Sequence, residues 1–71
     1  MAVLTSVQVV TERSRGGKVV QKDVSEIEGL LEAIEYANNL RQVYRNSGWI
    51  EQSASFKDPG NGDIVMIYAL L

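Results

Sequence analysis

The most strongly apolar pattern in the chain lies at its C-terminal end. Residues 64–71 are all apolar, rich in branched and aromatic side chains, and they follow a glycine-containing turn. Such a run favours a β-strand that is buried on both faces. Side chains alternate along a strand, so one face would carry Ile64, Met66, Tyr68 and Leu70, and the other Val65, Ile67, Ala69 and Leu71. Both faces need cover, either from the rest of the chain or from another chain.

The N-terminal part also alternates, which predicts two strands joined by a tight turn. Residues 3–13 form the first strand and residues 18–24 the second. Gly16 and Gly17 between them tolerate the positive φ angles that a two-residue hairpin turn requires. A turn centred on these glycines pairs Val9 with Val24 and places four valines on one face: Val7, Val9, Val20 and Val24.

The central part predicts a helix. Residues 25–28 read Ser-Glu-Ile-Glu, the pattern of a capping box, so the helix is expected to begin at Ser25. Gly48 or Asn46 is expected to end it in a left-handed cap. Its apolar positions recur at spacings of three and four and form one stripe that can lie on a sheet: Ile27, Leu30, Leu31, Ile34, Ala37, Leu40 and Tyr44.

Residues 49–57 alternate again and predict a third strand, with Ile50, Ala54 and Phe56 on one side. Residues 58–62 form a turn by composition, and the C-terminal strand follows. The predicted fold is a single α+β domain of order β-β-α-β-β, with one helix packed on one face of a four-stranded, mainly antiparallel sheet. A fully antiparallel sheet would run 1-2-4-3, with the C-terminal strand central, or 2-1-3-4, with that strand at an edge.

Length and composition narrow the functional classes. A chain of 71 residues buries only about 60% of its unfolded surface, so a monomer would be marginally stable and oligomerisation would help. There is no cysteine or histidine, which excludes Ser-His-Asp and Cys-His catalysis and the usual zinc sites. We therefore expect a non-enzymatic protein without a cofactor or metal. With no signal-peptide pattern and no apolar run of about 20 residues, we expect it in the cytoplasm, away from the membrane.

Two charged patches of opposite sign are predicted. Four of the seven basic residues lie around the glycine turn: Arg13, Arg15, Lys18 and Lys22. Such a tip could bind phosphate or an acidic protein surface, or it could be a solvated hairpin end whose charges prevent strand association. Three acidic residues are expected to face water along the helix: Glu28, Glu32 and Glu35. The net charge of −2 gives no general attraction to nucleic acid, which makes it an unlikely partner.

Trp49 directly follows the predicted helix. It could cover the core, or it could present an aromatic surface to a planar ligand or a partner. Its placement after the helix and before the final hairpin faintly resembles the dodecins, small flavin-storing proteins that assemble into shells. The resemblance implies an oligomer interface in which Trp49, Tyr68 and Met66 hold a planar cofactor.

The leading hypothesis is a small protein–protein interaction module or inhibitor. It would form a homodimer or higher oligomer and present a sheet face or edge, together with the charged patches, to another protein. The expected interface residues are Ile64, Met66, Tyr68, Leu70 and Trp49. Compact, acidic, cysteine-free chains of this size are frequent among phage inhibitors of host machinery, including anti-CRISPR proteins, which is an analogy of size only. The alternatives are an oligomeric flavin-like carrier and nucleic-acid binding through the basic hairpin tip.

Overall fold

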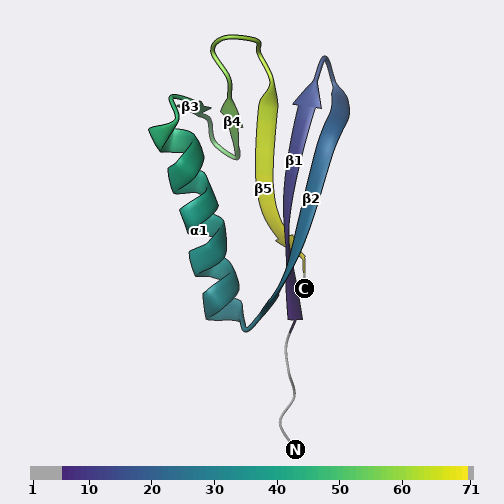
Figure 1. Cartoon of the computed structure of the whole chain (residues 1–71), viewed down its shortest axis with the longest axis vertical. Coiled ribbons are helices and arrows are strands. Elements are labelled where there is room, and N and C mark those ends of the chain that lie inside the picture. The colour runs from purple at the N-terminus through teal and green to yellow at the C-terminus, as the bar shows by residue number, and fades with distance from the viewer. Residues whose placement is uncertain (1–5, 71) are drawn as a thin grey trace, which may run out of the picture.

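A computed structural model describes residues 6–70. These residues form one helix and a five-stranded antiparallel sheet (Figure 1), in the chain order β1 (Ser6–Arg15), β2 (Lys18–Glu28), α1 (Leu30–Asn46), β3 (Ile50–Glu51), β4 (Ser55–Lys57) and β5 (Ile64–Leu70). The predicted α+β class with a single helix is confirmed, although the sheet has five strands rather than four. Residues 3–5 and 71 of the predicted strands lie outside the described residues.

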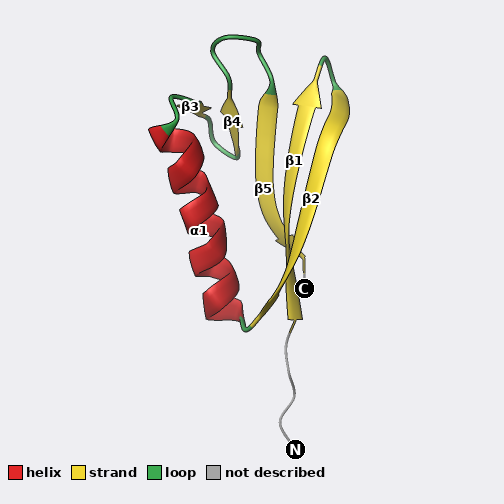
Figure 2. Ribbon diagram, in the orientation of Figure 1, coloured by secondary structure: helices red, strands yellow, loops and turns green. Residues whose placement is uncertain are grey.

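The strand order is β2-β1-β5-β4-β3, which neither predicted order matches. The C-terminal strand β5 lies between β1 and β4 and is antiparallel to both. It pairs with β1 from Ile64 to Leu70, but with β4 only from Ile64 to Met66. In Figure 2 the helix and β2 converge at their connection and diverge toward the other end, where β2 is the strand drawn farthest from the helix.

The first hairpin turns at the predicted place but has a different register. Gly16 and Gly17 adopt φ angles of 59° and 82°, and the flanking residues 15 and 18 pair as expected. A β-bulge then shifts the pairing between Arg13 and Ser14, which leaves Val20 as the extra residue. Val24 consequently pairs with Val10 instead of Val9. The prediction that Val20 and Val24 share a face with Val7 and Val9 is therefore wrong.

The predicted helix start is also wrong. Residues 25–28 continue β2, and α1 begins at Leu30 after Gly29, whose φ angle of 92° turns the chain. The Ser25 hydroxyl bonds the Tyr36 hydroxyl at 3.0 Å and does not cap a backbone amide. Ile27 packs against the core from the strand. The two inward-facing side chains thus satisfy the alternation of a strand, and these contacts outweigh the capping-box pattern.

The predicted apolar stripe is correct in the second half of the helix, where Ala37, Leu40 and Tyr44 contact the core, and wrong in the first half. Ala33 and Ala37 are buried, while Leu30, Leu31 and Ile34 are largely exposed. The alanines allow the helix to approach one face of the sheet closely, where the core contains Val7, Val9, Ala33, Ala37, Phe56, Val65 and Ile67. The predicted left-handed cap is confirmed at Gly48, whose φ angle is 87°.

The predicted third strand is interrupted. The Gln52 amide donates to the Ser55 carbonyl at 2.7 Å, and this tight turn separates β3 from β4. Of the three residues predicted to share one side, Phe56 is buried, whereas Ile50 and Ala54 are exposed. The turn over residues 58–62 is confirmed, with the Gly62 amide donating to the Asp58 carbonyl at 2.9 Å. The predicted alternation of the C-terminal strand is confirmed as well, because Val65 and Ile67 are buried and Met66 and Leu70 are exposed. Residues 6–70 therefore bury only one of the two faces that the apolar run favours as buried.

Candidate interaction surfaces

The side of the sheet opposite α1, here called the open face, is covered by no helix or strand of residues 6–70. Alternation and strand pairing define its residues: Lys22, Val24 and Glu26 from β2; Gln8, Val10, Glu12 and Ser14 from β1; Ile64, Met66, Tyr68 and Leu70 from β5. Met66, Leu70 and Val24 are 44%, 49% and 52% exposed. The open face is therefore an apolar surface with polar residues interspersed.

Three neighbouring side chains form the central row of the open face. Val10 pairs with Val24 on one side and with Tyr68 on the other. Val10 is only 1% exposed, although no other layer of the described chain covers it. The Tyr68 hydroxyl donates to the Glu12 carboxylate at 2.6 Å, and this hydrogen bond raises the pKa of Tyr68. The Lys22 ammonium lies 3.7 Å from the same carboxylate. Polar contacts between neighbouring side chains thus help to cover the valine.

Trp49 lies on the opposite side of the sheet from the other four expected interface residues. It is half-buried and packs against the core below the guanidinium of Arg13, which lies 5.2 Å from the ring centroid. Its ring meets Tyr44 edge-to-face with a centroid distance of 5.1 Å, and Tyr44 stacks on Phe56 at 5.9 Å. Trp49 therefore cannot form one cofactor site with Tyr68 and Met66 within a single chain.

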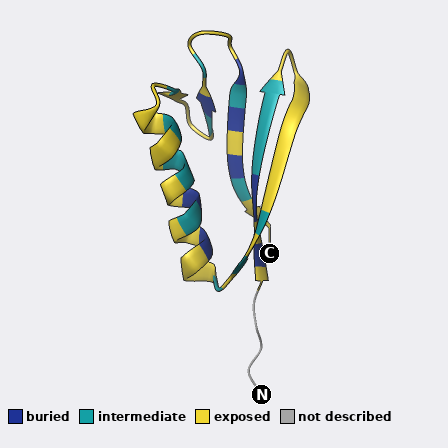
Figure 3. Ribbon diagram, viewed as in Figure 1, coloured by how far each residue is buried: buried dark blue, intermediate teal, exposed yellow. Residues whose placement is uncertain are grey.

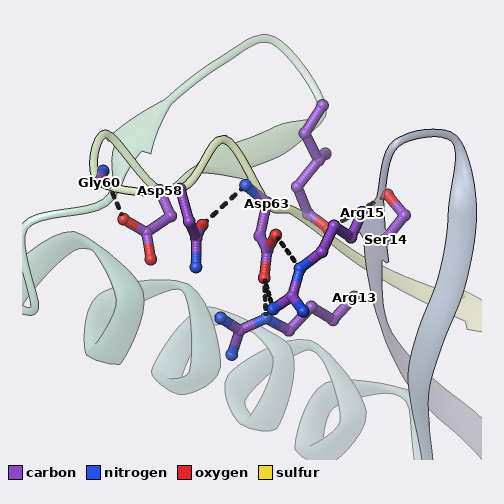
Figure 4. Close-up of polar contacts among 8 residues, drawn as sticks. Arg13, Ser14, Arg15, Asp58, Gly60 and Asp63 are labelled. Atoms are coloured by element: carbon purple, nitrogen blue, oxygen red, sulfur yellow. Dashed lines mark hydrogen bonds and ion pairs between the residues drawn. The ribbon is translucent and has the colours of Figure 1, made fainter.

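A buried carboxylate joins the first hairpin to the β4–β5 loop (Figure 4). The Asp63 side chain has no exposed surface. Its Oδ1 accepts a hydrogen bond from Arg15 Nε at 2.9 Å, and its Oδ2 accepts bonds from Arg15 Nη2 at 2.9 Å and Arg13 Nε at 2.8 Å. We call these three residues the Asp63 clamp. The bonds from Arg15 and Arg13 lower the pKa of Asp63 to about 2, although burial acts in the opposite direction.

The predicted basic patch is divided by these contacts. Arg13 and Arg15 are paired with Asp63, whereas Lys22 lies on the open face beside Glu12. Only Lys18 remains at the hairpin turn. Three of the four cations therefore lie beside a carboxylate, Arg13 and Arg15 at Asp63 and Lys22 at Glu12.

The three predicted acidic residues are all exposed, but they come from two elements. Glu28 ends β2, while Glu32 and Glu35 lie in the first half of α1. A side chain at Gly29 would collide with the Glu32 carboxylate, which reaches back toward the start of the helix. Within residues 6–70 there is no group of three or more acidic, histidine or cysteine side chains that could hold a metal ion.

A cavity of about 320 Å³ lies between α1 and the short strands β3 and β4. Its walls include Arg41, Phe56, Ile67 and the turn over residues 52–55. Glu51, which also lines the cavity, forms an ion pair with Arg45 at 3.0 Å, and this contact lowers the pKa of Glu51. The cavity adjoins the part of β5 that extends beyond β4. The side chains that line it are mainly polar and exposed.

The comparisons with known proteins do not assign a family. No family model matches the chain, and neither a curated protein nor a solved structure matches it. They consequently give no support to the dodecin resemblance. In the part of the chain that the structure describes, no helix has the length and apolar character to cross a membrane.

The pKa of Asp63 predicts how the clamp responds to acid. Because its pKa of about 2 in the folded state is below the ordinary value of 3.8, the stabilisation is present above pH 3.8 and is lost as the pH falls toward about 2. We expect the difference in free energy of unfolding between the wild type and Asp63→Asn to be constant near neutral pH and to shrink across this window. Urea denaturation at several pH values measures it. A difference of the same size at the acid end would contradict an ion-paired Asp63.

Proposed function

We propose that this chain is a protein-binding module that uses the open face to contact another protein. One observation carries the proposal: no helix or strand of residues 6–70 covers the open face, and its side chains Val24, Met66 and Leu70 are about half exposed. Exposed apolar side chains that gather on one face, rimmed by polar residues, commonly mark binding sites. Tyr68 and Met66 at its centre belong to the residue types that are enriched in protein interfaces.

The layering of the described residues supports this proposal. The helix covers one face of the sheet, so the described chain has two layers (Figure 3). The other face of the sheet is the open face. A partner that packs on the open face would add a third layer.

The charges around the apolar row favour a protein partner over a membrane. Lys22, Glu12 and Glu26 surround the central row and alternate in sign. An anionic membrane would attract a surface of predominantly positive charge, which the open face does not have. Alternating charges around an apolar centre are instead typical of the rim of a protein interface, where they set orientation and specificity.

A pair of matched double variants tests the proposal. Met66→Lys with Leu70→Lys places two cations on the open face, and Leu31→Lys with Val43→Lys places two on the exposed side of α1, where the native residues are 73% and 59% exposed. We expect proteins captured from a cell lysate by the immobilised wild type to bind the open-face variant at least about tenfold more weakly, because apolar burial is replaced by desolvation of a cation. The helix variant should bind them as the wild type does.

Quantitative mass spectrometry of the captured proteins distinguishes the outcomes. Partners that are lost with the open-face variant and retained with the helix variant support the proposal. Partners lost equally with both variants, or no partner enriched by the wild type, would contradict it. Far-UV circular dichroism of all three proteins verifies that each remains folded.

A further inference from the structure

The outer edge of β2 is a second unpartnered feature. It presents backbone groups to a further strand, whereas the proposed binding surface is made of side chains on the sheet face. β2 is the first strand in the sheet order, and residues 6–70 provide no strand beyond it. It has no proline, and its residues 18–24 are all exposed; in Figure 3 this part of β2 is yellow. Long edge strands without a bulge or proline are ready templates for another strand. The bulge at Val20 leaves residues 21–28 as the regular part of this edge.

Symmetry limits how two copies of this edge can pair. In an antiparallel pair, opposite residues have their side chains on the same face. The two strands of a twofold dimer are identical, so facing residues must also be an even number of positions apart in the sequence. The twofold axis therefore passes beside one residue, which faces its own copy. For the regular part of β2, the residues that can lie near the centre are Lys22, Asp23, Val24, Ser25 and Glu26.

Like-charge contacts exclude three of these registers, and unfavourable pairing of apolar with charged side chains excludes a fourth. Centres at Lys22, Asp23 or Glu26 would place two like charges directly opposite each other, which is destabilising. A centre at Ser25 would place Val24 opposite Glu26 and Asp23 opposite Ile27, which pairs apolar side chains with carboxylates.

A centre at Val24 places Val24 opposite its own copy. On each side of the axis, Lys22 of one copy then faces Glu26 of the other. In the same way, Asp23 of one copy faces Ser25 of the other. This register contains no like-charge pair within residues 21–27. It also brings apolar side chains together at the axis and flanks them with two pairs of opposite charge.

We propose that two copies of this chain associate through antiparallel pairing of their β2 edges, with the twofold axis at Val24. The two five-stranded sheets then form one continuous sheet, and both helices lie on the same side of it. This inference does not depend on the proposed partner of the open face, because the residues that test that proposal, Met66 and Leu70, are in β5.

Charge exchange tests the pairing. Glu26→Lys places two lysines opposite each other on both sides of the axis. Lys22→Glu places two glutamates opposite each other on both sides. We expect each single variant to weaken self-association at least about tenfold, because two favourable pairs become unfavourable. The double variant Lys22→Glu with Glu26→Lys restores opposite charges and should self-associate as the wild type does. Sedimentation velocity at low and high protein concentration measures the effect.

The double variant also separates association from folding. Lys22→Glu alone brings a second carboxylate close to Glu12, so the single variant could lose stability. Restored association in the double variant cannot arise from such damage. If the wild type is monomeric at high concentration, or if Lys22→Glu with Glu28→Lys restores the dimer instead, the proposed interface is overturned.

A single cysteine tests the register directly, because the natural chain has none. The Cα atoms of facing residues in an antiparallel pair lie about 4.5–5.5 Å apart, within the range of a disulfide. Val24→Cys should therefore form a covalent dimer under mild oxidation. Val19→Cys is the matched control, because Val19 is 55% exposed and Val24 is 52% exposed. In this register residue 19 would lie about 34 Å from its copy, at about 3.4 Å per residue. Equal crosslinking of the two variants would overturn the register.

Discussion

Asp63→Asn is expected to lower the melting temperature by more than about 5 °C, a large change for a domain of this size. The substitution preserves the shape of the side chain but removes its charge. Arg13 and Arg15 would then converge on a neutral amide whose nitrogen is itself a donor, so at least one of the three hydrogen bonds in Figure 4 would be lost. The buried position leaves no room for water to replace it.

Asp58→Asn in the same loop is the matched control for the Asp63 clamp. Asp58 Oδ1 accepts a hydrogen bond from the Gly60 amide at 2.8 Å, and an asparagine oxygen can accept the same bond. We expect its melting temperature to stay within about 2 °C of the wild type. Thermal unfolding followed by circular dichroism measures both variants. Equal effects would mean that the loop, and not the ion-paired carboxylate, provides the stability.

The elements that the sequence predicts correctly are those determined by local chemistry. Two adjacent glycines require a tight turn, and Gly48 is at the left-handed position that ends a helix. The alternation of β5 is also a local property, because successive side chains of a strand point to opposite faces. None of these predictions depends on which strands are neighbours.

The helix start could not be predicted because its sequence fits two structures. Residues 25–28 match a capping box, and they also alternate as a strand does. Contacts distant in sequence decide between these: the Ser25 hydroxyl bonds Tyr36, and Ile27 joins the core. The glycine that follows is the local signal, because its positive φ supports a sharp turn between the strand and the helix.

The candidate surfaces depend on tertiary structure in the same way. The sequence places Ile64, Met66, Tyr68 and Leu70 on one face, and that is correct. It does not reveal the Asp63 clamp, since Asp63 meets Arg13 and Arg15 only when β5 lies beside β1. The observable hint is a single acidic residue at the start of an apolar strand in a chain with an arginine-rich hairpin. Strand order is needed to connect the two.

The two proposed interactions are geometrically compatible. A twofold axis perpendicular to the sheet keeps both open faces on the same side, and Val24 is the residue closest to that axis. The central rows of Val24, Val10 and Tyr68 would then meet at Val24 and form a single apolar band across the dimer. A partner with two matching sites would engage both copies, which raises its apparent affinity through effective concentration. Pairing of the two β2 edges would thus enlarge the apolar surface that the open faces present to a partner.

Phe56→Ala is expected to lower the free energy of unfolding by about 3–5 kcal/mol, as for other buried phenylalanines. A domain of this length has roughly 4–10 kcal/mol in total, so the variant would lose a large fraction of its stability. Phe56 is 3% exposed, pairs with Val65 of β5 and stacks on Tyr44 of α1. It is the only buried side chain of the short strands β3 and β4 among the described residues, so it anchors both of them to the core.

Ile50→Ala in β3 is the control, because Ile50 is largely exposed and its truncation should cost no more than about 0.5 kcal/mol. Urea denaturation should be followed by both far-UV circular dichroism and Trp49 fluorescence. If Phe56 stabilises the whole fold, the two signals of Phe56→Ala will shift together to lower urea, because a cooperative two-state transition moves every probe equally. A shift in Trp49 fluorescence alone would show instead that β3 and β4 detach while the rest of the sheet stays folded.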